Sequence, residues 1–157
     1  MTLLAIDPGR SVKEASIGYC VFQDVSGHGD IREMERGEIA WHGLVHLLRP
    51  YPASLLLRFK DVSISEVVVE NFVNNTRSRG GQTNGPSEVI GAIEYAAALC
   101  GTPFTRQPNT ILPVAKLHAG YEQKLKHLPH QDAAFLHGYY YLVSKGLLTP
   151  KGLASTL

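Results

Sequence analysis

The sequence predicts an α/β protein in which helices flank a mixed β-sheet, and three observations support this fold class. Two short apolar runs near the start, residues 3–6 and 18–22, indicate neighbouring strands joined through a Pro-Gly turn. Residues 66–72 contain the unbroken run Val67-Val68-Val69, which is typical of a strand covered on both faces. Residues 132–144 carry a helical pattern near the end of the chain. Strands and helices in this order predict a sheet covered by helices.

The remaining segments complete this layout. Residues 37–41 are expected to form a third strand after a polar hairpin loop at 24–36. Apolar residues across 43–60 predict helical packing in two pieces, because Pro50 and Pro52 break it. The other predicted elements are a helix opening at Pro86, a strand at 103–106 and a helical region at 112–125 interrupted at Gly120. Residues 1–146 are therefore expected to form one domain, with 147–157 as a C-terminal tail.

Length and composition narrow the class of protein. A chain of 157 residues with 44% hydrophobic content suffices to bury the core of one domain. Its two cysteines, Cys20 and Cys100, have neither metal-ligand spacing nor the density of a disulfide scaffold, which favours reduced core residues in a cytoplasmic protein. A charge at Asp7 comes too early for a signal peptide, and no apolar run approaches the roughly 20 residues of a membrane span.

Three carboxylates stand at the ends of predicted elements. Asp7 ends the first strand and precedes a Pro-Gly turn, Glu70 ends the buried valine run, and Asp132 opens the last helix. Each has an ordinary structural explanation: turn chemistry for Asp7, a solvated strand end for Glu70, and the helix dipole for Asp132. Their conjunction favours a metal site, because Mg²⁺ prefers oxygen ligands and paired ions about 4 Å apart promote phosphodiester hydrolysis.

The motif series resembles that of the RuvC-like Holliday-junction resolvases, which have an RNase H-like fold, and in particular their compact phage-type members. It comprises Ala5-Ile6-Asp7-Pro8-Gly9, then Ile17-Gly18-Tyr19-Cys20-Val21, then Val67-Val68-Val69-Glu70, and finally Asp132-Ala133-Ala134. The resemblance implies that Asp7, Glu70 and Asp132 hold two Mg²⁺ ions, with Mn²⁺ able to substitute. It further implies a homodimer that resolves four-way or branched DNA junctions by paired nicking, since a two-fold substrate calls for two identical sites.

One position departs from the family. The family places a fourth ligand three residues before the helix aspartate, where this chain has Pro129. His130 is the nearest substitute, as a metal ligand or general base, but in a regular helix it would point about 200° away from Asp132. It reaches the site if the helix begins only at residue 131 or 132. The alternative is a surface histidine near a helix start.

The net charge of +1 conceals a local basic excess, because six Lys and Arg side chains oppose three Glu side chains in residues 73–127. A polar, glycine-containing loop after Glu70 is suited to phosphate contacts, and a neighbouring phenylalanine to base stacking. A solvated connection and a core phenylalanine are the alternatives. The residues expected to contact DNA are Phe72, Asn74, Arg77, Arg79, Lys116, Lys124 and Lys126.

Other functions compete with junction resolution. The same fold and metal chemistry suit a nuclease acting on RNA, RNA–DNA hybrids or flaps. Pro129 at the expected ligand position suggests a junction-binding protein without catalysis. An actin-like ATPase shares an Asp-Pro-Gly turn, but it needs a much longer, two-lobed chain.

Overall fold

The computed structural model describes residues 1–9, 16–71, 84–124, 126 and 128–151. Its main sheet has five strands in the order β3-β2-β1-β7-β8, and a smaller sheet has the order β4-β5-β6. The strands are β1 (Thr2–Asp7), β2 (Ile17–Asp24), β3 (Ile31–Ile39), β4 (Leu48–Tyr51), β5 (Leu56–Phe59), β6 (Val62–Ile64), β7 (Glu66–Asn71) and β8 (Phe104–Pro108). Strands β1, β2 and β3 pair antiparallel, whereas β7 pairs parallel with both β1 and β8. The sheet is therefore mixed, as predicted.

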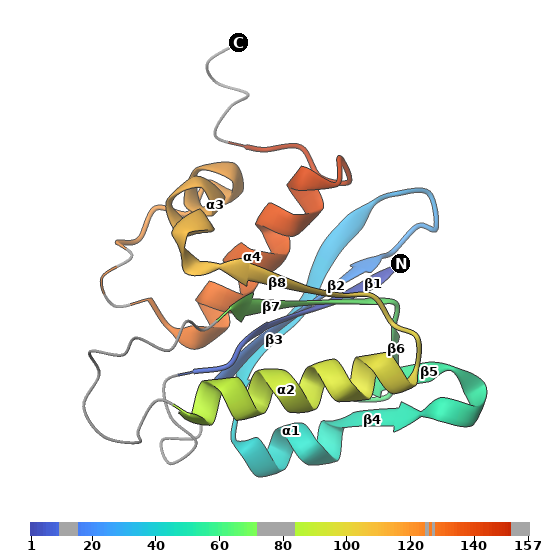
Figure 1. Ribbon diagram of the computed structural model, residues 1–157. Helices are drawn as coiled ribbons and strands as arrows, with labels where there is room; N and C mark the ends of the chain where they lie inside the picture. The colour runs from blue at the N-terminus through green and yellow to red at the C-terminus, as the bar shows by residue number, and fades with distance from the viewer. Residues whose placement is uncertain (10–15, 72–83, 125, 127, 152–157) are drawn as a thin grey trace.

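Helices cover both faces of this sheet (Figure 1). The α-helices are α1 (Trp41–Leu47), α2 (Asn84–Leu99), α3 (Leu112–Ala119) and α4 (His130–Ser144), and two short 3-10 helices are η1 (Pro52–Ser54) and η2 (Asn109–Ile111). Helices α1 and α2 lie on one side with the small sheet, and α3 and α4 lie on the other (Figure 1). Within the part of the chain that the structure describes, no helix combines the length and apolarity that crossing a bilayer requires.

The adjacent strands β1 and β7 carry the core on both faces. Leu4 and Ile6 pack toward α2 in one apolar cluster, whereas Leu3, Ala5 and Val68 pack toward α4 in the other. Residues 3–6 are fully buried, and burying one large aliphatic side chain stabilises the fold by roughly 1.5–3 kcal/mol. The unalternating apolar sequence of these strands is thus explained by helices on both sides.

Most predicted elements are confirmed, but the second half of the region 43–60 is not helical. Strands β4 and β5 form an antiparallel hairpin there, around η1. Along β5, Leu57 and Phe59 are buried whereas the alternate residues Leu56 and Arg58 are half-buried, which is the two-residue period of a strand. The predicted third strand begins earlier than expected, at Ile31, and residue 41 already belongs to α1.

The end of the chain contacts the α3–α4 layer. Leu148 packs against the apolar cluster beneath α4, and the backbone N–H of Lys151 donates to the carbonyl of His118 over 2.7 Å. The boundary at residue 146 between a domain and a tail stays a prediction.

Helix α4 lies close to the sheet because residue 138 has no side chain. A Cβ at Gly138 would overlap the ring of Phe22 and lie 3.0 Å from the Cβ of Ala5. In contrast, a Cβ at Gly91 in α2 would meet nothing within 4 Å. The two helical glycines therefore provide a matched comparison.

We expect Gly138→Ala to lower the free energy of unfolding by about 1–3 kcal/mol, because the added methyl group forces α4 away from β1 and β2. Gly91→Ala is expected to raise it by up to about 1 kcal/mol, because alanine is the better helix former and space is available. Urea denaturation of the two variants measures both effects. Equal changes in the unfolding free energy of the two variants would contradict the close approach of α4 to the sheet.

Candidate metal centre at the edge of the sheet

Asp7 lies at the end of β1, with only 7% of its surface exposed. One carboxylate oxygen, Oδ1, accepts the backbone N–H of Gly9 over 3.0 Å, so the expected turn chemistry is present. Gly9 has a φ of 77°, which favours glycine. The second oxygen, Oδ2, lies 2.8 Å from Nδ1 of His130. Asp7 therefore has both a structural role in the turn and a partner across the site.

Glu70 stands beside Asp7 on the neighbouring strand. The parallel register pairs Ile6 with Val69, so Asp7 and Glu70 occupy the next positions on strands spaced about 4.8 Å apart. Side chains alternate along a strand, and Ala5 and Val68 face α4, so the two carboxylates also point to the α4 side. The sheet thus delivers two acids to one edge on one face.

Two histidines of α4 meet these acids. His130 contacts Asp7, and Nε2 of His137 lies 3.1 Å from Oε2 of Glu70. Residues seven apart in an α-helix lie within about 20° of each other around the axis, so both imidazoles face the strand ends. His137 is fully buried.

Gln107 on β8 completes the surroundings of His137. Its Oε1 lies 3.3 Å from Nδ1 of His137, and its Nε2 donates to the His137 carbonyl oxygen over 3.4 Å. Both ring nitrogens of His137 therefore face oxygen atoms. These contacts hold the imidazole, and through it Glu70, in one orientation.

The start of α4 is fixed against β2 and β3. The helix begins at His130, two residues earlier than predicted, and the His130 backbone N–H donates to Oε1 of Glu38 over 3.0 Å. The same carboxylate accepts the hydroxyl of Ser16 over 3.0 Å. A Cβ at Gly18 would overlap the His130 carbonyl, so β2 and the helix start approach this closely because residue 18 is glycine.

Asp132 lies on a different side of α4 and makes different contacts. Its Oδ1 accepts Nη1 of Arg36 over 2.8 Å, and its Oδ2 accepts the hydroxyl of Tyr121 over 2.8 Å. The Arg36 guanidinium lies 3.9 Å above the ring of Phe135. Burial, together with the hydrogen bond to Asp132, raises the pKa of Tyr121 to about 12, so this hydroxyl remains a donor at neutral pH. Both oxygens of Asp132 are thus engaged away from Asp7 and Glu70.

The types of donor atom at this edge suit a divalent cation, but the described donors are not yet gathered around one point. Asp7, Glu70 and His130 offer two carboxylates and an imidazole at one edge. The carboxylates suit Mg²⁺ or Mn²⁺, whereas the imidazole is a ligand more typical of later transition metals. Among the described residues, however, no group of three or more His, Cys, Asp or Glu side chains is already gathered around one point. Cys20 is no candidate ligand, because burial raises the pKa of its thiol and keeps it protonated.

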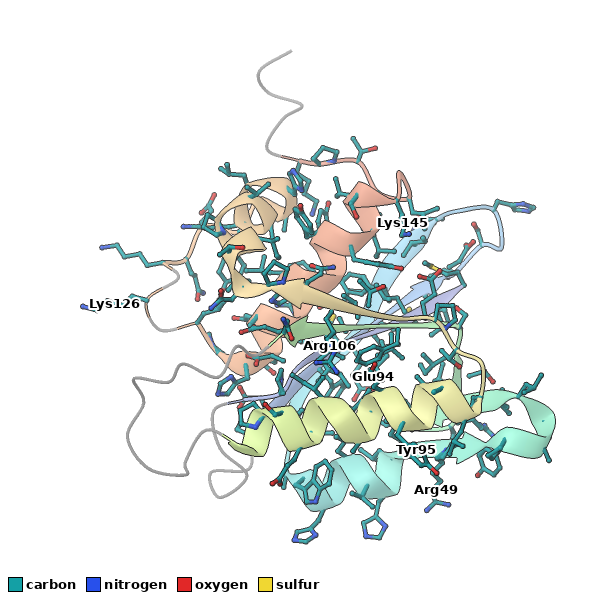
Figure 2. The ribbon with its side chains drawn as sticks, in the orientation of Figure 1. Arg49, Glu94, Tyr95, Arg106, Lys126 and Lys145 are labelled. Carbon is teal, nitrogen blue, oxygen red and sulfur yellow. The ribbon has the colours of Figure 1, made fainter. Side chains whose placement is uncertain are left out.

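The residues predicted to contact DNA are only partly described. Phe72, Asn74, Arg77 and Arg79 lie outside the described residues. Lys116 is half-buried on α3, while Lys124 and Lys126 are exposed in the connection between α3 and α4, from which Lys126 projects outward (Figure 2). Their DNA contacts stay a prediction.

Several site residues were not predicted from the sequence. Arg36, one partner of Asp132, and Glu38, the acid that holds the start of α4, come from β3, which is distant in sequence, so no local pattern marks either residue. A signal for His137 did exist in its seven-residue spacing from His130.

Neither a protein-family model nor a curated protein matches this sequence. Solved structures do match. The Thermus thermophilus RuvC structure is 19% identical with a TM-score of 0.56, covering 96% of this chain and 99% of that chain. Thermus thermophilus RuvC in complex with a Holliday-junction substrate is 14% identical with a TM-score of 0.59, at the same coverage. The fowlpox virus Holliday-junction resolvase is 14% identical with a TM-score of 0.53, covering 92% and 99%. These similarities confirm the predicted RNase H-like fold of the RuvC type.

We expect Asp132→Asn to lower the free energy of unfolding and to leave the affinity for a metal ion almost unchanged. The substitution weakens the contact with Arg36 and is expected to cost about 1.5–3 kcal/mol of unfolding free energy, a typical range for a hydrogen bond to a charged group. Calorimetric titration with Mn²⁺ is expected to change little in this variant and to lose its binding signal in Asp7→Asn. Asp30→Asn, which removes the exposed partner of Arg32, is the control. Loss of Mn²⁺ binding in Asp132→Asn would instead make Asp132 a ligand.

Proposed function

We propose that this chain is a divalent-metal-dependent endonuclease that resolves four-way or branched DNA junctions by paired nicking. The observation that carries the proposal is the placement of Asp7 and Glu70 at adjacent strand ends, facing His130 at the start of α4. It is supported by the fold shared with Thermus thermophilus RuvC and with the fowlpox virus resolvase, each of which is described with a Holliday junction.

We assign the donors of the metal to Asp7, Glu70 and His130. Two Mg²⁺ ions per site, replaceable by Mn²⁺, are the proposed cofactors, with Asp132 adjacent to the site rather than central to it. When bound, divalent ions polarise a phosphodiester oxygen and lower the pKa of a coordinated water, which makes hydrolysis feasible at neutral pH.

The protein residues supply orientation. The N–H of Gly9 fixes one oxygen of Asp7, and His137, held by Gln107, fixes one oxygen of Glu70. Such neighbours restrict the rotation of carboxylates and reduce the cost of ordering them when a ligand binds. The phosphate backbone would be held by Lys116, Lys124, Lys126 and the loop that follows Glu70.

A homodimer is part of this proposal, because symmetric nicks in a junction need two identical sites. The outer face of α2 supports it, since small residues surround an exposed tyrosine there. Tyr95 is 67% exposed and Leu99 is 37% exposed, and Gly91, Ala92 and Ala98 are exposed beside them. Figure 2 shows Tyr95 on this helix. We place the enzyme in the cytoplasm, where its two buried cysteines stay reduced.

Paired nicking of a four-way junction tests the function. We expect Mg²⁺-dependent cleavage of the junction by the wild type, and its loss by at least about 10³-fold in Asp7→Asn and in Glu70→Gln, because each removes a charged donor from the metal. Junction binding should persist in both variants. Faster cleavage of an RNA–DNA hybrid or a flap than of the junction would contradict resolution.

The same assay separates catalysis from binding alone. The engagement of Asp132 by Arg36 and Tyr121 favours a junction-binding protein without cleavage as the second candidate. Tight junction binding without any nicking in Mg²⁺ or Mn²⁺ would establish that candidate and overturn the nuclease.

The α2 face is tested by sedimentation velocity. We expect Tyr95→Glu to convert a dimer into a monomer, because it buries a charge in an apolar contact. Leu117→Glu is the matched control, since Leu117 is 62% exposed on α3. A dimer that persists in Tyr95→Glu would exclude this face.

A further inference from the structure

The small sheet carries a basic pocket that the catalytic site does not use. The pocket has a volume of about 230 Å³ and lies between the end of α1 and the β4–β5 hairpin. Its lining includes His46, Arg49, Arg58 and Lys60, with Asp61 as the acidic member. Arg49 lies on the side of the molecule that carries α1 and the small sheet (Figure 2). This is a concentrated positive charge in a chain of net charge +1.

Arg49 and Arg58 are directly opposite each other in the β4–β5 ladder. Side chains at opposed positions have Cβ atoms about 4.5–5.5 Å apart, and like charges placed there destabilise a sheet. Folding does not require this pair, because a neutral residue at either position would avoid the repulsion. An anion between the two guanidinium groups would turn the repulsion into attraction.

The hydrogen bonds of both guanidinium groups within the described part of the chain go to carbonyl oxygens and not to carboxylates. Nε of Arg49 donates to the carbonyl of His46 over 2.8 Å, and Nη2 of Arg58 donates to the carbonyl of Asp61 over 2.7 Å. Nε of Arg58 is buried and has no hydrogen-bond partner among the residues that the structure describes. Neither arginine forms a salt bridge with a carboxylate of the described residues. Both thus retain charge and donors for a ligand.

Lys60 differs from the two arginines. It is paired with Glu35, and that hydrogen bond raises the pKa of Lys60. Its charge is therefore largely compensated within the protein. The uncompensated charge of the pocket belongs to Arg49 and Arg58, whose planar guanidinium groups match phosphate oxygens in pairs.

The pocket lies one short helix away from the catalytic edge. Asp7 pairs with Gly18, and Gly18 pairs with Glu38, so the end of β3 shares the edge that carries Asp7. Helix α1 begins at Trp41, shortly after that strand ends, and its seven residues extend about 10 Å before Arg49 follows. The pocket lies on the α1 side of the sheet, whereas Asp7 and Glu70 point to the α4 side, so a DNA arm reaches the pocket by passing around the end of β3 and along α1 (Figure 1). A duplex presents one backbone charge per roughly 1.7 Å of its axis, so phosphates occur all along such an arm.

We propose that Arg49 and Arg58 bind backbone phosphates of a DNA arm that extends from the catalytic edge. The inference rests on the proposed function for its ligand, because a pair of opposed arginines, one exposed and one half-buried, suits an extended polyanion. The contact is independent of base sequence. It adds a DNA-contacting surface to the one expected around the loop after Glu70.

Salt-dependent junction binding tests this assignment. Fluorescence anisotropy is measured without divalent ions at several salt concentrations for the wild type, Arg49→Gln, Arg58→Gln and the double variant. We expect each substitution to weaken binding about five- to tenfold and to reduce the slope of log affinity against log salt by about one. Nicking at saturating junction should be unchanged, because neither arginine lies in the catalytic site.

Arg32→Gln is the matched control, because Arg32 is an exposed arginine of β3 that is paired with Asp30. Arg49 is also exposed, so Arg49→Gln tests the inference even if Arg58→Gln impairs folding, which circular dichroism detects. Affinity and slope in Arg49→Gln equal to those in Arg32→Gln would overturn the inference.

Two further outcomes show whether the pocket binds free phosphate or DNA, and whether the phosphate site and the nuclease proposal stand or fail separately. If inorganic phosphate raises the melting temperature of the wild type but not of the double variant, while junction binding is unaffected, the pocket binds free phosphate and the DNA assignment fails. If the slopes change as expected but the wild type never nicks DNA, the phosphate site stands and the nuclease proposal fails.

Discussion

The parallel pairing of β1 with β7 is the constraint on which the rest of the structure depends. Both strands are buried on two faces, so their register is fixed by side chains that must enter two different apolar clusters. A shift of one residue would exchange the clusters and carry Asp7 and Glu70 to opposite faces of the sheet. Core packing and placement of the acids are therefore one and the same requirement.

Helix α4 places its polar side chains on two sides, and one of these sides contacts the acids at the edge of the sheet. His130 and His137 meet the two carboxylates, whereas Asp132 joins Arg36 and Tyr121. Glycines at positions 18 and 138 allow the close approach on which these contacts depend. In the metal site that we propose, an imidazole from α4, rather than its carboxylate, completes the set of donors.

Features that depend on neighbouring residues could be predicted from the sequence, whereas contacts between distant residues could not. The valine run before Glu70 and the Asp-Pro-Gly turn after β1 specify their own conformations, so these elements and their acids were predicted correctly in place. The apolar residues around Leu57 suit a helix or a strand equally in so short a run, and the β4–β5 hairpin was missed. The engagement of Asp132 by Arg36 joins residues 96 positions apart, and no local pattern contains it.

The position of a bound metal ion tests the central claim most directly. Crystals of the protein soaked in Mn²⁺ and measured at an anomalous wavelength locate the ion without reference to activity. The structure predicts an anomalous peak at the edge of the sheet within coordination distance of Asp7, Glu70 and His130, about 2.0–2.3 Å from their donor atoms. A peak coordinated by Asp132 in place of His130, or the absence of any peak beside Asp7 and Glu70, would contradict it.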